Sequence, residues 1–190
     1  MKRIFLIAGL ATAFLLVVVA ASAQKASFAG TWNLDKTKSQ GLSPRMQGAD
    51  SVTWTIAQDD KTISVDQKVT GGQPPAGGGG GGTGGGGGMG GGGARPPGGP
   101  QSYNLDGKEA TSDMTIGQAT GKLTTKATMS GGTVELMRKT AFTGQDGTER
   151  VNSTTQKLSL SGDGKTLTAV VHSEGGRGGP TDSTLVFNKQ

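Results

Sequence analysis

The sequence predicts an all-β fold, an antiparallel up-and-down barrel of about 8 to 10 strands that carries one long disordered Gly-rich loop. Apolar residues alternate with Thr, Ser and charged residues over most of the chain after residue 28. Turn signals separate these runs at hairpin spacing. Sequential hairpins favour a meander that closes to remove its strand edges, and a two-sheet sandwich is the alternative.

The first 23 residues have the organisation of a secretory signal peptide. Lys2 and Arg3 form a basic start, residues 4–20 an apolar run, and Ala21-Ser22-Ala23 a small-residue cleavage site. Cleavage before Gln24 predicts export to the periplasm or the extracellular space, with no membrane span left. The alternative is a retained anchor, since the apolar run reaches the lower limit of a bilayer-spanning helix.

Charge and cysteine content narrow the class of protein. The chain carries 19 Lys and Arg against 14 Asp and Glu. Removal of Lys2 and Arg3 with the signal peptide lowers the net charge from +5 to +3. The remaining charged residues are interspersed along the chain. The sequence therefore indicates no nucleic-acid partner. With no Cys and a single His, the chain has neither a disulfide nor a zinc-ligand spacing, and we expect no metal and no cofactor.

Residues 71–100 interrupt the strand pattern, because 19 of these 30 residues are Gly and five are Pro. Such a segment has almost no side chain to bury and is expected to be disordered. The part before it, 24–70, is too short to close a core of its own. We therefore predict a single β-barrel domain over 24–190, interrupted by this loop.

The strands follow one another in hairpins. A first strand around Gly30 and Trp32 precedes a region, 36–46, that lacks strand character and fits a brief helix or coil. Hairpins are predicted over 52–69, 123–142 and 158–171, and a short final strand over 185–187. The Asp-Gly pairs at 106–107, 146–147 and 163–164 mark turns in which both residues tolerate a positive φ.

The run Phe28-x-Gly30-Thr31-Trp32-x-Leu34 resembles the first strand of lipocalins and fatty-acid-binding proteins, the calycin-type barrels. In that group the Trp plugs the closed end of the barrel, so the resemblance implies structural roles for Gly30 and Trp32. The final strand lacks the Arg that the larger family packs against this Trp, and Lys189 is the nearest cation.

Much of the rest of the chain, including 103–108, 158–167 and 185–190, also resembles small exported bacterial proteins of no settled function, often described as lipocalin-like.

No group of residues predicts catalysis, and we expect a protein that is not an enzyme. His172 lies near Glu174, but a general base also needs a nucleophile or a metal beside it, so a solvated side chain is the expected role. The acidic turns lack the spacing of a calcium-binding loop. The Gly-rich run over 175–179 resembles one RGG element and is interpreted as a hairpin loop.

Aromatic residues are the candidate ligand contacts. Trp54, Tyr103 and Phe142 are the predicted ligand-binding residues, and core filling is the alternative, since few large side chains are available. The predicted function is that of an exported, non-enzymatic lipocalin-like protein that binds a small lipophilic molecule. The alternative is a structural or envelope-associated interaction protein whose Gly-rich loop is a flexible surface tether.

Overall fold

A computed structural model of the chain describes residues 26–71, 99–116, 119–144, 147–175 and 179–190. The described residues form one ten-stranded antiparallel sheet and a short helix. The elements are β1 Gly30–Leu34, α1 Pro44–Gly48, β2 Ser51–Gln58, β3 Thr62–Thr70, β4 Gln101–Asn104, β5 Ala110–Ile116, β6 Ala119–Ser130, β7 Thr133–Thr143, β8 Glu149–Leu160, β9 Thr166–Glu174 and β10 Thr181–Lys189.

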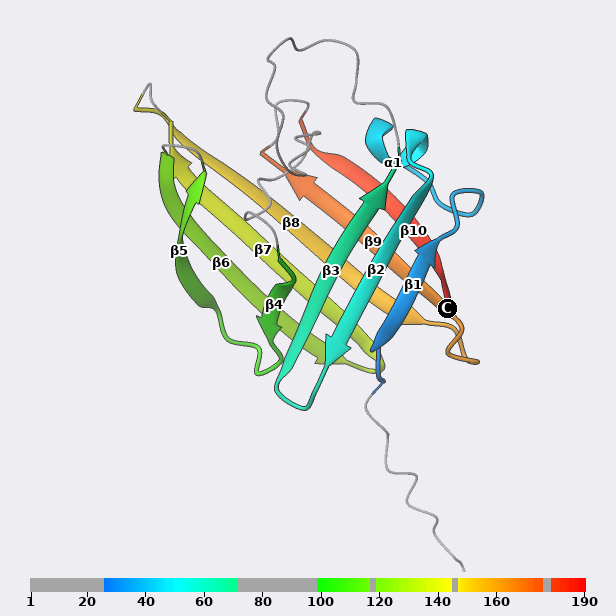
Figure 1. The fold of residues 1–190 in the computed structure, drawn as a ribbon. Coiled ribbons are helices and arrows are strands. Elements are labelled where there is room, and N and C mark those ends of the chain that lie inside the picture. The colour runs from blue at the N-terminus through cyan, green and yellow to red at the C-terminus, as the bar shows by residue number, and fades with distance from the viewer. Residues whose placement is uncertain (1–25, 72–98, 117–118, 145–146, 176–178) are drawn as a thin grey trace, which may run out of the picture.

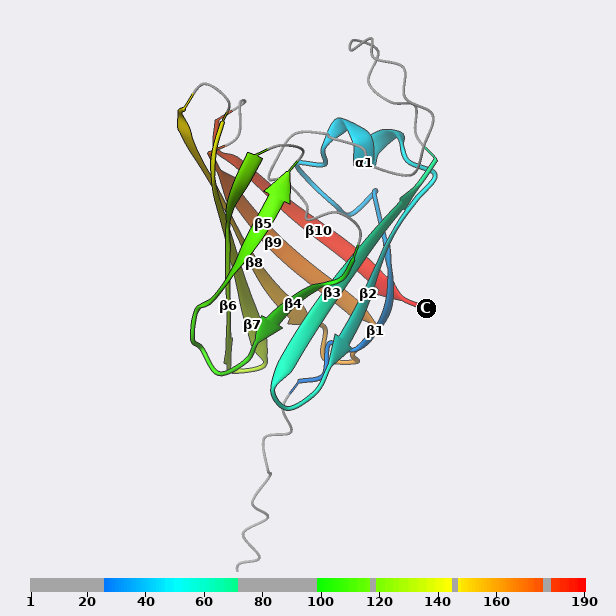
Figure 2. The ribbon, with the colours of Figure 1, turned by 60° about the vertical axis from the view of Figure 1, so that its left-hand side comes forward.

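The strand order β4-β3-β2-β1-β10-β9-β8-β7-β6-β5 is that of an up-and-down meander. Consecutive strands pair, except β4 with β5, and β1 also pairs with β10, which brings the two ends of the described chain together (Figure 1). The sheet curls into a nearly closed barrel (Figure 2). The predicted barrel is therefore confirmed, and the sandwich is wrong because all the described strands belong to one sheet.

Several predictions fall wholly or partly outside the described residues. They concern the expected signal peptide, 1–23, residues 72–98 of the expected disordered loop, Asp146 of one Asp-Gly turn, and residues 176–178 of the hairpin loop expected over 175–179. Within the described parts of the chain, no helix is long and apolar enough to cross a membrane.

The three predicted hairpins are present as β2–β3, β6–β7 and β8–β9. The brief helix expected after the first strand is α1, where Ser43 caps the N-terminus and its side chain accepts a hydrogen bond from Met46 N. The final strand, β10, is longer than predicted. Thr and Ser occupy much of its first half, so apolar alternation does not reveal that it pairs with β9 over its whole length.

In the described Asp-Gly turns, the aspartates do not adopt the positive φ that the sequence prediction allowed for both residues. Among the described residues only glycines have positive φ, and these include Gly107 at 75° and Gly164 at 67°. The preceding aspartates act through their carboxylates instead, since Asp106 Oδ1 accepts from Lys108 N and Asp163 Oδ1 accepts from Lys165 N. These are side-chain-stabilised turns, which explains why Asp is favoured at both positions.

An apolar core fills one end of the barrel, which we call the Trp32 end. It includes fully buried side chains from β1, β3 and β8 to β10 and from the segment before β1: Phe28, Trp32, Ile63, Leu158, Leu167 and Phe187. Trp54 packs on Phe187 with a ring-centroid distance of 4.5 Å. This burial supplies the main stabilisation that a domain without disulfides needs.

The interior becomes polar farther along the strands. On β7 the inward-facing residues begin with Val134 and Leu136 and continue with Arg138 and Thr140. On β8, which runs antiparallel, Leu158 lies opposite Val134 and Thr154 lies opposite Arg138. The barrel thus has an apolar half at the Trp32 end and a polar layer on the side of α1.

The wall of the barrel is interrupted between β4 and β5. β4 covers only residues 62–65 of β3, and β5 covers only residues 119–125 of β6. β4 and β5 end the strand order and do not pair with each other, although β4 lies near β6. This interruption gives the polar layer a lateral opening.

Candidate functional site

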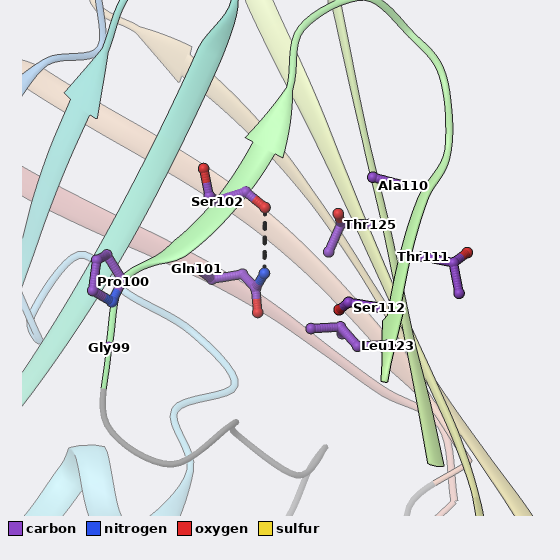
Figure 3. A pocket seen from close by; sticks show the side chains of 9 residues that line it. All are labelled: Gly99, Pro100, Gln101, Ser102, Ala110, Thr111, Ser112, Leu123 and Thr125. Carbon is purple, nitrogen blue, oxygen red and sulfur yellow. Dashed lines mark hydrogen bonds between the residues drawn. The ribbon is translucent and has the colours of Figure 1, made fainter. Parts of the chain in front are cut away.

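A cleft of about 440 Å³ lies at the interruption between β4 and β5 (Figure 3). Figure 3 shows Gln101 on the β4 side and Ser112 on the β5 side, with Thr125 of β6 behind them. Its lining residues are mostly small or uncharged polar: Gly99, Pro100, Gln101, Ser102, Ala110, Thr111, Ser112, Leu123 and Thr125. The cleft reaches the inner face of the sheet at Thr125, which is only 6% exposed.

Two buried oxygens near this cleft have no hydrogen-bond partner among the described residues. They are Oε1 of Gln101 and Oγ1 of Thr140. Gln101 uses its amide nitrogen to donate to Ser102 O at 3.3 Å, which leaves the oxygen to accept. An unsatisfied buried polar atom costs about 1–3 kcal/mol, so both atoms are suited to pair with a bound molecule.

Arg138 and Tyr103 add a cation and a hydroxyl to the same region. Arg138 lies opposite Thr125 across the β6–β7 ladder, and its Nε and Nη2 atoms are buried. Tyr103 faces inward two residues after Gln101 on β4 and is 5% exposed. Burial raises the pKa of Tyr103 to about 12, and the charge of Arg138 opposes that shift. The phenol is therefore a protonated donor at neutral pH.

The three predicted ligand-binding residues do not form one site. Trp54 belongs to the core, where its Nε1 donates to Gln67 Oε1 at 3.2 Å. Tyr103 is also part of the core but borders the polar layer. Phe142 is half-buried near the far end of β7, where it pairs with Gly121. Among the described lining residues of the cleft, none is aromatic.

The two residues assigned to the barrel plug occupy the Trp32 end. Trp32 is fully buried, and its Nε1 donates to Phe28 O at 2.9 Å. Gly30 has a φ of 142°, and a Cβ there would lie 3.0 Å from Lys189 Cε. Trp32 therefore belongs to the apolar core, and Gly30 lies beside the Lys189 side chain.

His172 lies on the outer face of β9, away from the cleft. Its Nδ1 is 2.7 Å from Asp182 Oδ1, and its Nε2 is 3.2 Å from Glu174 Oε1. Asp182 and then Glu174 raise the pKa of His172 through these contacts. Both ring nitrogens are occupied by carboxylates. In the described part of the chain, no group of three His, Asp or Glu residues is placed to hold a metal ion.

Sequence reasoning missed the polar residues of the candidate site, which are Gln101, Thr125, Arg138 and Thr140. A signal was present on β7, where Arg138 and Thr140 interrupt an otherwise apolar inward-facing set. No comparable signal marks Gln101 or Thr125, because isolated polar residues are common in strands that face solvent on one side.

Comparison of the chain with protein-family models, with curated proteins and with solved structures found no significant match.

Proposed function

We propose that this chain is an exported, non-enzymatic binding protein of lipocalin-like type, whose small-molecule ligand occupies the polar layer of the barrel and enters through the β4–β5 cleft. One observation carries the proposal: Gln101, whose buried Oε1 has no partner among the described residues, lines the cleft. Small-molecule sites combine an enclosed surface with a few placed polar groups.

The side chains around the cleft favour an amphipathic or polar ligand over a wholly lipophilic one. Apolar side chains already fill the Trp32 end, where Trp32 and Phe187 are both fully buried. The cleft and the layer behind it present Gln101, Thr125 and Thr140 instead. We therefore refine the lipophilic ligand predicted from the sequence to a molecule whose polar part contacts these residues.

Binding without a reaction is the activity that the lining residues favour. Those of the described chain include Ser102, Thr111 and Ser112, but no His, Asp, Glu, Lys or Arg that could act as a base toward them. Activation of a hydroxyl nucleophile requires such a base within hydrogen-bond reach. The residues present can hold a molecule by hydrogen bonds and by contact with Leu123.

The test begins with the full chain expressed in a bacterial host that exports it. Protein sequencing of the exported form should start at Gln24, and a start at Met1 would favour the retained anchor. Native mass spectrometry should then detect a bound small molecule. Detection of protein alone, together with a reproducible crosslink to one envelope macromolecule, would favour the structural or envelope-associated alternative.

A substitution that fills the cleft provides the matched test. Ala110→Trp places a large side chain in the opening, and the amount of co-purified small molecule should fall. Thr55→Trp adds the same side chain at an exposed position of β2 and should leave it unchanged. Equal occupancy in the two variants would contradict entry through this cleft.

A further inference from the structure

We propose that the ligand is a compact, uncharged polyhydroxyl compound, a sugar or another polyol, that donates a hydroxyl hydrogen to Oε1 of Gln101. The inference deepens the proposed function and rests on it. Three features support it: a lining without charge among the described residues, a buried acceptor in that lining, and a mixture of hydroxyl and apolar groups on the inner face of β5 to β7.

The described residues that line the cleft carry no charge. Their hydrogen-bonding side chains are one amide and four hydroxyls: Gln101, Ser102, Thr111, Ser112 and Thr125. An ionised ligand would lose hydration against this surface without meeting an opposite charge in it. Arg138 is not one of the lining residues, and it already interacts with other groups of the protein, so it does not call for an anion. The lining therefore favours an uncharged ligand.

Gln101 determines which kind of group the ligand presents at the β4 side of the cleft (Figure 3). Its Nε2 donates to Ser102 O, and its buried Oε1 has no partner among the described residues. This oxygen can only accept, so a carboxylate or phosphate oxygen would oppose it and an apolar surface would leave it unsatisfied. An uncharged hydroxyl donates to it without the cost of burying a charge.

The inner face of β5 to β7 continues the same chemistry. Leu123 of the cleft lies opposite Ser112 on β5 and opposite Thr140 on β7. Thr140 is 2% exposed, and its Oγ1 has no partner among the described residues. In the next row, Ala110 lies opposite Thr125. Hydroxyls that donate and accept thus alternate with apolar side chains, which matches the O–H and C–H groups of a polyol.

The filling of the barrel limits the rest of the ligand. An acyl chain would need the space that Phe28, Ile63 and Leu158 occupy with no exposed surface. The cleft volume of about 440 Å³ is in the lower part of the range of small-molecule sites. The ligand is therefore compact and does not carry a long apolar tail.

The experiment uses the full chain and matched probes. Glucose and myo-inositol are the uncharged polyols, glucuronate and glucosamine add a negative or a positive charge to a sugar ring, and cyclohexanol keeps a ring with one hydroxyl. Each is titrated while the backbone amide resonances of Ser112 and Thr125 are followed by NMR. The better of the two polyols should bind at least about fivefold more tightly than the other three probes. A charged sugar or cyclohexanol binding as tightly would overturn the proposal.

Gln101→Met tests the acceptor, because it removes the carbonyl oxygen and keeps a side chain of similar length. It should weaken polyol binding by about two- to tenfold, the loss expected for one hydrogen bond. The control is Gln47→Met on α1, where the exposed Gln47 amide also donates to a backbone oxygen, Leu42 O at 2.6 Å, and binding should be unchanged. If Gln101→Met fails to fold, Ser112→Ala at an exposed position takes its place and should weaken binding by about twofold or more. Unchanged polyol binding in the folded cleft variant would overturn the assignment.

Molecules extracted from the exported protein separate this inference from the proposed function. An uncharged polyol that is retained by Gln47→Met and reduced in Gln101→Met supports both. A charged or lipophilic extracted molecule overturns the polyol assignment and leaves small-molecule binding intact. The absence of any extracted molecule, with no response to the five probes, overturns both.

Discussion

Lys189 Nζ lies 5.1 Å from the centroid of the Trp32 ring. The two residues are direct partners in the β1–β10 ladder, which joins the first and last strands of the chain. A cation of the final strand thus covers the tryptophan of the first strand, although the sequence lacks the arginine expected there by resemblance. Lysine can make this contact because cation–π attraction requires only a positive charge near the ring.

Replacing Lys189 tests the strength of this contact. Lys189→Gln should lower the free energy of unfolding by about 0.5–1 kcal/mol, the usual range at an exposed site, whereas Lys189→Arg should preserve it. Urea denaturation followed by tryptophan fluorescence measures the change. Lys139→Gln serves as the control on an exposed strand position, and an equal loss in both variants would argue against a specific contact.

Gly30 should be intolerant of a side chain. Its φ of 142° is strained for any other residue, and a Cβ would press on Lys189 Cε at 3.0 Å. Gly30→Ala is expected to destabilise the fold by about 1–3 kcal/mol, measured by thermal or urea unfolding. Gly48→Ala, where a Cβ meets nothing within 4 Å, should be nearly neutral. A neutral Gly30→Ala would contradict the backbone assignment.

Tyr103 should make stability depend on pH at alkaline values. Its pKa is raised by burial to about 12, so the folded state binds more protons than the unfolded state between the unfolded value of 10.0 and this value. Its contribution is fully present below pH 10 and is lost as the pH rises toward 12, by at most about 1.4 kcal/mol per pH unit. Tyr103→Phe should flatten this dependence in unfolding experiments.

The same tyrosine reports on Arg138. Because the Arg138 charge lowers the pKa of Tyr103, Arg138→Gln should raise it further, as seen in an ultraviolet titration of the single tyrosine. An unchanged titration curve would show that the guanidinium does not act on the phenol, and the control Lys139→Gln should match the wild type.

Replacing Thr140 with Val should weaken ligand binding without destabilising the ligand-free protein. Its Oγ1 is buried without a partner among the described residues, so Thr140→Val should leave the ligand-free protein as stable or up to about 1 kcal/mol more stable. Thr154→Val is the contrast, since the Thr154 hydroxyl bonds Ser173 Oγ at 3.3 Å and its loss should destabilise. Chemical denaturation of ligand-free samples compares them, and clear destabilisation by Thr140→Val would count against the assignment.

His172 should titrate above its usual pKa because of Asp182 first and Glu174 second. Asp182→Asn is expected to lower the pKa of the single histidine more than Glu174→Gln does, as measured by NMR titration. Stability gained from these contacts is present below the ordinary pKa of 6.5 and declines as the pH rises through the raised value. The opposite ranking of the two variants would contradict the observed geometry.

Much of the fold could be predicted because its signals are local. Alternation along β2, β3 and β6 to β9 identifies strands, and Gly-containing turns fix where each hairpin reverses. Sequential hairpins then predict a meander. The length of β10 could not be predicted, because its first half lacks apolar residues and only its pairing with β9 defines it.

The candidate site could be predicted much less well. Residue type alone predicts Trp54, Tyr103 and Phe142 as ligand contacts, whereas the structure places Trp54 in the core and brings Tyr103 near Arg138. The contact between His172 on β9 and Asp182 on β10 exists because the register of the β9–β10 pair places the two residues opposite each other. Such neighbours are set by strand pairing across the barrel, which no single stretch of sequence encodes.

The sequence by itself determined the all-β class and the hairpins, since backbone propensity and the two-residue period act over a few residues. Only the tertiary structure decided that β4 and β5 fail to pair and that Gln101 and Thr125 line the opening between them. It also decided that Lys189 covers Trp32. The physical reason is that burial and charge pairing are properties of groups distant in the chain that folding brings together.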